Sequence, residues 1–175
     1  MSHPAARQVL VAGIGNIFFG DDAFGSEVAR ELLRQGPLPG ATVIDFGIRS
    51  QDLAYVLADG GYDATILIDA TARGRPPGTI YVIEPDLAEL EDAESAATID
   101  NAHGLHPVSA LQMVRALGGH CGCLYLVACE PEVLDTEALG LSETVQAAVP
   151  RAIETIRSLV DDLLRGKPML ETASA

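Results

Sequence analysis

Short apolar runs that alternate with helix-like segments constrain the fold of this chain more than any other sequence feature. Runs of this length without polar alternation are typical of strands that are buried on both faces. The five runs are Val9–Ala12, Ala41–Phe46, Thr65–Ile68, Thr79–Ile83 and Leu124–Ala128. Strands that alternate with helices favour a mainly parallel sheet between two helical layers.

Apolar residues at helical spacing occupy the segments between these runs, as expected for helices that cover a sheet. The first helix ends before Pro37, and the second spans Gln51–Ala58. A third begins at Pro107 and the last at Ser142, where Pro150 is expected to kink the helix or to mark a join. The sequence therefore predicts a single-domain α/β fold, a three-layer sandwich with a twisted, mainly parallel five-stranded sheet and helices on both faces.

Length and composition agree with one folded domain. The chain has 175 residues, 48% of them hydrophobic and 21% charged, which is enough apolar material for one continuous core. We expect the domain to cover residues 9–165, between flexible ends at 1–8 and 166–175. The first apolar run is too short for a signal peptide, and no run approaches the length of a membrane span. A cytoplasmic protein is therefore expected, and we expect it to be a monomer.

The charge balance limits the kinds of partner. The formal net charge is −14 and the isoelectric point is about 4.4. Such a surface repels phosphate backbones and anionic lipids, so neither a nucleic acid nor a membrane is an expected partner. A basic peptide or a metal cation would be attracted to it.

Acidic residues follow three of the predicted strands, at the edge of the sheet where active sites of such folds form. Asp21 and Asp22 follow the first strand. Asp45 lies near the end of the second strand, and Asp69 directly follows the third. Each has a structural alternative, because aspartate also caps helices and turns. One acid of the first pair is expected to serve the start of the helix, while the other projects over the sheet edge.

His103 adds an imidazole in the loop before the helix that begins at Pro107. The neighbouring His106 could cap that helix instead. Two carboxylates and one imidazole from three loops would form an incomplete nitrogen–oxygen site, suited to nickel or zinc and open to water or substrate.

Other chemistries have weaker support in the sequence. Gly13–Gly15 begins a dinucleotide-binding pattern, but Phe18 stands where that motif needs its third glycine. No G-x-S-x-G nucleophile motif is present. Cys121, Cys123 and Cys129 have neither metal-site spacing nor the pattern of a disulfide framework, and we expect them to be reduced thiols.

Taken in chain order, several short stretches resemble the nickel–iron hydrogenase maturation endopeptidases, the proteases that process the hydrogenase large subunit. The resemblance extends from about residue 9 to residue 164. The matching stretches are Gly13–Asn16, Asp21–Gly25, Ile68–Ala70, His103–Leu105, Cys129–Glu132 and Gly140–Ser142.

The resemblance implies a hydrolase of the aspartyl or metal-dependent type that removes the C-terminal extension of a hydrogenase large-subunit precursor after nickel insertion. It implies that Asp22, Asp69 and His103 are both the catalytic and the metal-contacting residues. Nickel is the implied metal, supplied by the substrate, and another divalent metal could occupy the site in isolation. Two alternatives stay open: a non-catalytic chaperone that binds nickel or the precursor, and another metallohydrolase on the same scaffold.

Overall fold

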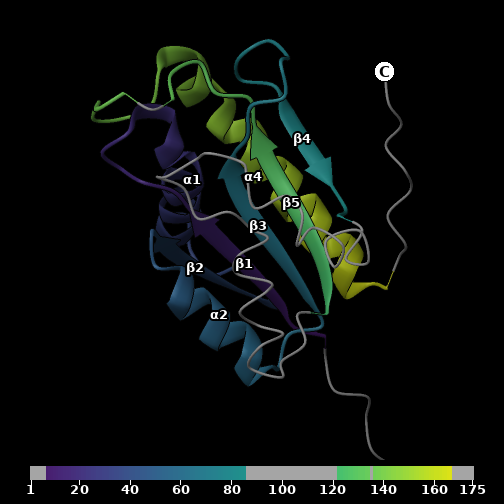
Figure 1. Ribbon diagram of the computed structural model, residues 1–175. Helices are drawn as coiled ribbons and strands as arrows, with labels where there is room; N and C mark the ends of the chain where they lie inside the picture. Colours follow the sequence, from purple (N-terminus) through teal and green to yellow (C-terminus); the bar gives the residue numbers. More distant parts are fainter. Residues whose placement is uncertain (1–6, 86–121, 135, 167–175) are drawn as a thin grey trace, which may run out of the picture.

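The computed structural model describes residues 7–85, 122–134 and 136–166, which form a sheet covered by helices (Figure 1). The strands are β1 (Val9–Ile14), β2 (Ala41–Gly47), β3 (Ala64–Ala70), β4 (Ile80–Ile83) and β5 (Cys123–Cys129). The helices within these ranges are η1 (Gly20–Ala23), α1 (Phe24–Arg34), α2 (Ser50–Asp59) and α4 (Glu143–Leu164). All five predicted strands form, each within two residues of its expected bounds.

The strand order in the sheet is β2-β1-β3-β5-β4. The four strands β2, β1, β3 and β5 are parallel, whereas β4 pairs with β5 in the antiparallel direction. The predicted mainly parallel five-stranded sheet is thereby confirmed. The carboxyl ends of the four parallel strands meet at one edge, which we call the carboxyl edge.

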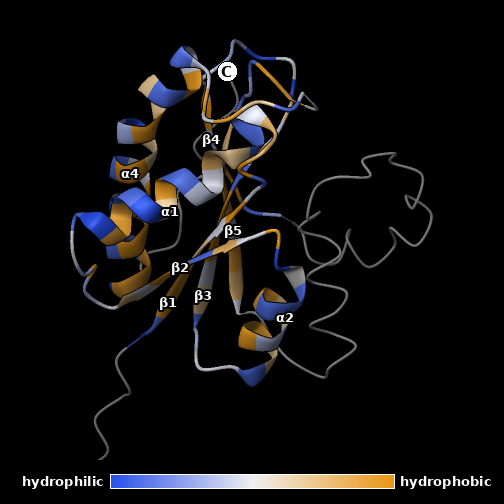
Figure 2. Cartoon of the chain, turned by 90° about the vertical axis from the view of Figure 1, so that its left-hand side faces the viewer, coloured by the Kyte–Doolittle hydropathy of each residue, from blue (hydrophilic) through white to orange (hydrophobic). Residues whose placement is uncertain are grey.

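Helices cover both faces of the sheet, as the continuous apolar runs predict. Figure 2 shows α1 and α4 on one face and α2 on the other. Alternate β1 side chains enter two separate cores: Val9 and Val11 pack with α1 and α4, and Leu10 and Ala12 pack with α2. Every residue of β1 is buried, which explains why its sequence shows no polar alternation.

Two glycines bring α1 into direct contact with the carboxyl edge. A Cβ atom at Gly25 would lie 2.0 Å from the carbonyl oxygen of Ile68 and 2.1 Å from that of Ile14. A Cβ atom at Gly13 would lie 2.3 Å from the carbonyl oxygen of Gly25. Only glycine permits this approach, and it holds Asp22, three residues before Gly25, above the ends of β1 and β3.

Pro150 lies inside the last helix and does not mark a join, because α4 runs unbroken from Glu143 to Leu164. Pro150 is exposed, so the carbonyl that loses its helical partner is on the side open to water. On α1, Leu33 lies past the edge of the buried stripe that includes Val28, Ala29 and Leu32, and it is 53% exposed.

Two other predicted elements, the connection Asp86–Asn101 and the helix that begins at Pro107, lie outside the described residues. Within the described part of the chain, no helix has the length and hydropathy to cross a membrane.

Candidate functional site

Asp22 of η1 and Asp69 of β3 lie together at the carboxyl edge. Burial of the Asp69 carboxyl and, next, the negative charge of Asp22 raise the pKa of Asp69 well above its ordinary value of 3.8. The Ala70 amide donates a hydrogen bond to Asp69 Oδ1 at 2.8 Å and works in the opposite direction. The two acids predicted from separate loops therefore form one electrostatically coupled pair.

The turn after β1 wraps around the Asp22 carboxylate. The Asn16 amide donates a hydrogen bond to Asp22 Oδ2 at 3.0 Å, and the Phe18 amide donates one to Asn16 Oδ1 at the same distance. A Cβ atom at Gly15 would lie 1.9 Å from the Asp22 carbonyl oxygen, and Gly15 has a φ of 149°. Gly15 and Asn16 thus fix the backbone that presents Asp22, a role that the sequence analysis did not assign to them.

Asp21 has a different task from its neighbour. It is fully buried, and its Oδ2 accepts hydrogen bonds from the amides of Glu132 at 2.9 Å and Val133 at 2.8 Å. Ser142 donates to it twice, from its amide to Oδ1 at 2.7 Å and from its hydroxyl to Oδ2 at 3.0 Å. We expected one acid of the pair to cap the helix, but α1 has no side-chain cap. Asp21 instead anchors the loop before α4 to η1.

Asp45, the third acid predicted near this edge, has structural partners. Its Oδ2 accepts a hydrogen bond from Arg30 Nε at 2.8 Å, and its Oδ1 accepts one from the Gly47 amide at 3.0 Å. Asp45 therefore ties β2 to α1.

Glu130 is a buried acid that the sequence analysis did not select as a site residue. It is 4% exposed, and its carboxylate accepts hydrogen bonds from the amides of Arg73 and Gly74 at 2.9–3.0 Å and from the Tyr81 hydroxyl. Burial alone would raise the pKa of Glu130, but these hydrogen bonds outweigh burial and lower it. In turn, burial and the bond to Glu130 raise the pKa of Tyr81 to about 12.

The bonds to Glu130 fix the segment that follows Asp69. Because β5 lies between β3 and β4, the connection from β3 to β4 must cross the end of β5. Glu130 holds this crossing from its backbone as well: its amide donates to the Thr79 carbonyl, and its carbonyl accepts from the Gly78 amide, both at 2.8 Å. An isolated glutamate directly after an apolar strand is the sequence signal that marks this anchor.

The sequence matches the model of a known protein family. The family is that of the hydrogenase maturation proteases, and the match covers residues 26–159, which is most of the chain. The chain belongs to this family. The protein is accordingly a hydrolase, an endopeptidase that acts in hydrogenase maturation, as the resemblance implied.

Individual members of the family match over most of their length. The hydrogenase expression/formation protein HupD of Rhizobium leguminosarum bv. viciae is 32% identical over 158 residues, covering 87% of this chain and 73% of HupD. The hydrogenase 2 maturation protease of Escherichia coli is 30% identical over 154 residues, covering 85% and 88%. The solved structure of the E. coli hydrogenase maturating endopeptidase HybD superposes with a TM-score of 0.74 at 26% identity, covering 89% of this chain and 93% of HybD.

The third predicted ligand of the maturation protease, His103, lies outside the described residues, as does His106. Among the described residues, no three histidine, cysteine, aspartate or glutamate side chains converge on one point. The structure thus brings two of the three predicted site residues together, and the role of His103 stays a prediction.

The described thiols of the protease are unpaired and unsuited to nucleophilic attack. Cys129 is buried, and burial followed by the charges of Asp21 and Glu130 raises the pKa of its thiol to about 12. Cys123 is exposed at the opposite end of β5 from the acid pair. Cys121 lies outside the described residues.

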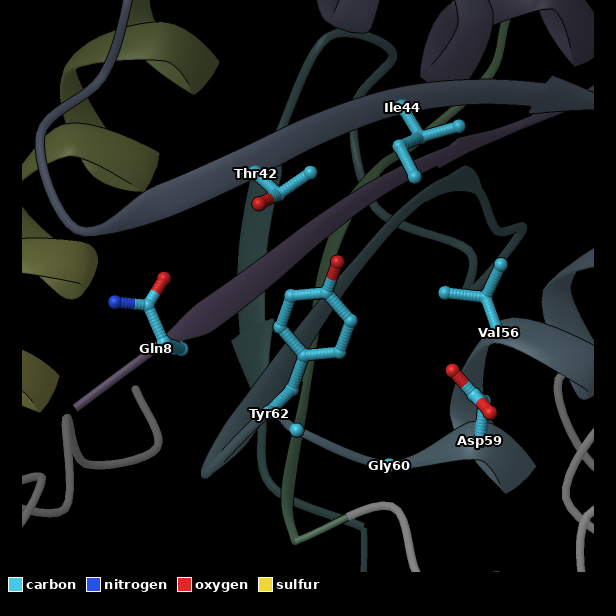
Figure 3. A pocket seen from close by; sticks show the side chains of 8 residues that line it. Gln8, Thr42, Ile44, Val56, Asp59, Gly60 and Tyr62 are labelled. Carbon is cyan, nitrogen blue, oxygen red and sulfur yellow. The ribbon is translucent and has the colours of Figure 1, made fainter. Parts of the chain in front are cut away.

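The described residues also form a pocket of about 420 Å³. It is lined by Gln8, Thr42, Ile44, Val56, Asp59, Gly60, Gly61 and Tyr62 (Figure 3). Gln8 precedes β1 and Tyr62 precedes β3, so the pocket opens at the amino ends of these strands. Asp22 and Asp69 lie at their carboxyl ends, which separates the pocket from the candidate active site.

Proposed function

We propose that this protease removes the C-terminal extension of a nickel–iron hydrogenase large-subunit precursor once the precursor holds nickel. Asp22 and Asp69, together with His103, contact the nickel of the substrate. The proposal is supported by the coupled carboxylates at the carboxyl edge, where the charge of Asp22 raises the pKa of Asp69. Two acids that repel each other gain stability when a cation binds between them.

The donor set suits recognition of a metal that already has other ligands. Two aspartates and one histidine are too few donors for a closed structural site. Carboxylates alone also discriminate poorly among divalent ions. Nickel that the precursor holds through other ligands can complete its coordination with these side chains, so that docking requires both the right protein and the right metal. A precursor without nickel leaves the two carboxylates facing each other without a cation, which disfavours its binding.

The experiment compares processing of precursor prepared with and without nickel. Purified protease is incubated with each, and the C-terminus is read by intact mass. We expect cleavage of the nickel-loaded precursor only. Cleavage of both forms at one rate would contradict recognition of nickel, but would leave the endopeptidase assignment intact. Binding without any cleavage would instead favour the chaperone alternative.

Alanine variants test whether the three proposed site residues are required for this processing. Asp22→Ala, Asp69→Ala and His103→Ala should each stop processing of the nickel-loaded precursor. Asp45→Ala is the matched control, because it removes an acid near the same sheet edge that is held by Arg30 and Gly47. Its rate of processing should stay within about twofold of wild type, as for a residue outside the machinery.

A further inference from the structure

Exposed large hydrophobic side chains are concentrated at the carboxyl edge. Five such side chains are more than half exposed among the described residues: Phe18, Leu33, Ile48, Tyr55 and Leu139. Leu33 and Tyr55 lie on helices α1 and α2. The other three lie in loops that follow β1, β2 and β5. We call Phe18, Ile48 and Leu139 the apolar rim.

Backbone hydrogen bonds join the two segments that carry Phe18 and Leu139. The Ala138 amide donates to the Phe18 carbonyl at 3.0 Å, and the Gly20 amide donates to the Ala138 carbonyl at 2.9 Å. Phe19 and Ala138 form a parallel bridge and are half-buried. Successive side chains of a paired segment alternate between its faces, so Phe18 and Leu139 share the outer face. Phe18 is 60% exposed and Leu139 is 83% exposed.

The same turn holds both Phe18 and the Asp22 carboxylate. The Asp22 amide donates a hydrogen bond to the Phe19 carbonyl at 3.2 Å, and the Asn16 amide binds Asp22 Oδ2 at 3.0 Å. On the other side, the Gly15 amide donates to the Gly47 carbonyl at 3.1 Å, which places Ile48 next to this turn. The rim therefore adjoins the acid pair.

We propose that the apolar rim is the surface on which the folded hydrogenase large-subunit precursor docks. The inference rests on the proposed function, because it takes the acid pair as the point that the precursor must reach. A specific protein interface covers about 800 Å² of each partner, far more than two carboxylates present. A precursor that reaches Asp22 must also cover the turn that carries Phe18.

The composition and the support of the rim suit this role. Aromatic and aliphatic side chains at the centre of an interface supply most of its binding free energy. The rim backbone is fixed in advance, since Asp21 binds the amides of Glu132, Val133 and Ser142 on either side of Leu139. A fixed backbone loses little conformational entropy when a partner binds. A second copy of the protease on the rim would cover the acid pair and block it, so the precursor is the fitting occupant.

The test measures the affinity of immobilised protease for nickel-loaded precursor from the same organism. The rim variant is Phe18→Ala/Leu139→Ala. The control is Leu33→Ala/Tyr55→Ala, which also removes one aromatic side chain and one leucine from exposed positions. We expect the rim variant to raise the dissociation constant at least about tenfold, and the control to change it less than about twofold. Ile48→Ala should have an intermediate effect.

Processing of the same precursor, followed by mass spectrometry against protease concentration, separates docking from chemistry. The rim variant should need a higher concentration for half-maximal processing and should reach the wild-type rate at saturation. An unchanged dissociation constant in the rim variant would contradict docking on the rim, whether or not the saturated rate of processing falls. If the wild-type protein binds the precursor through the rim but never shortens it, the proposed function fails while the docking surface stands. Self-association that disappears in the rim variant, with precursor affinity unchanged, would assign the surface to a second copy and overturn the proposal.

Discussion

Two pairs of acids at the same edge of the sheet have opposite surroundings. Asp21 and Glu130 are buried and accept hydrogen bonds from backbone amides and from hydroxyl groups. Asp22 and Asp69 each accept a hydrogen bond from a backbone amide, but the charge of Asp22 also raises the pKa of Asp69. The pKa of Glu130 is lowered, whereas that of Asp69 is raised well above the ordinary range. The surroundings of each acid, and not its residue type, therefore distinguish the two structural anchors, Asp21 and Glu130, from the two site residues, Asp22 and Asp69.

The difference is sharpest between two consecutive residues. Asp21 points into the protein and holds a loop more than a hundred residues later in the chain. Asp22, the next residue, contributes its carboxylate to the acid pair. The anchors keep two segments in place beside the pair, the loop before α4 and the crossing from β3 to β4. The site can tolerate repulsion between its acids because the neighbouring backbone is held elsewhere.

The largest expected effect separates activity from stability at Asp69. Asp69→Asn removes the ionisable group with little change of shape, and processing of nickel-loaded precursor should fall about 10³-fold or more. Because the folded-state pKa of Asp69 is raised, the stability it contributes is full below its unfolded pKa and is lost as pH rises through the folded value. The variant should therefore unfold at the same or a higher temperature than wild type at pH 7.

Calorimetry and intact mass of the product measure the two properties on one preparation. The control is Asp45→Asn, which should keep activity and lose a little stability with its bond to Arg30. An Asp69→Asn protein that processes normally would remove the basis for the site.

The second effect is the reverse, a loss of stability at the anchors. Asp21→Ala leaves the amides of Glu132, Val133 and Ser142 without their acceptor, and Glu130→Ala does so for Arg73 and Gly74. A hydrogen bond to a charged group contributes about 1.5–3 kcal/mol, and less where water can replace the acceptor, as at the exposed Arg73, Gly74 and Glu132. Each variant should therefore lose about 2 kcal/mol of unfolding free energy in a denaturant titration.

Asp22→Ala is the comparison for these anchor variants, and it should lose less stability than they do, because it removes the bond from the Asn16 amide but also the charge that disfavours ionised Asp69. Anchor variants as stable as wild type would mean that the two pairs of acids do not differ in structural role.

The sequence alone predicts the sheet well, because continuous apolar runs mark the strands. It also predicts that Asp22 and Asp69 meet, because parallel strands end at one edge. It does not predict the anchors, since Asp21 and Glu130 find their partners through contacts between distant segments. Glu130, for example, binds amides 56 and 57 residues earlier in the chain. The unbroken α4 shows a second limit, because the effect of Pro150 depends on whether its turn faces water.

A third effect, smaller again, is a difference in how stability depends on pH. The folded-state pKa of Glu130 lies below its ordinary value of 4.5. The stability that its charge contributes is present above that value and is lost as pH falls through the lower folded-state pKa. Between neutral pH and pH 4.5 wild type should keep this contribution, and it should lose it progressively as the pH falls further. Glu130→Gln, which cannot ionise, should give a flatter acid limb in unfolding free energy. Identical acid limbs would mean that the Glu130 charge is not stabilised by its hydrogen bonds.

The smallest expected effect is at the thiols, and it tests the surroundings of Cys129 between the two anchors. Burial and then the negative charges of Asp21 and Glu130 raise the pKa of Cys129 to about 12, so almost no thiolate exists at pH 7. Cys129→Ala and Cys123→Ser should each process precursor within about twofold of wild type, and Cys121→Ser is expected to do the same.

In native protein, Cys129 should react with a thiol reagent far more slowly than the exposed Cys123. The signal of Cys123 is identified by its loss in the Cys123→Ser variant. Unfolding in denaturant should remove the difference between the two thiols. A fast-reacting Cys129 in the folded state would contradict the burial that raises the pKa of its thiol.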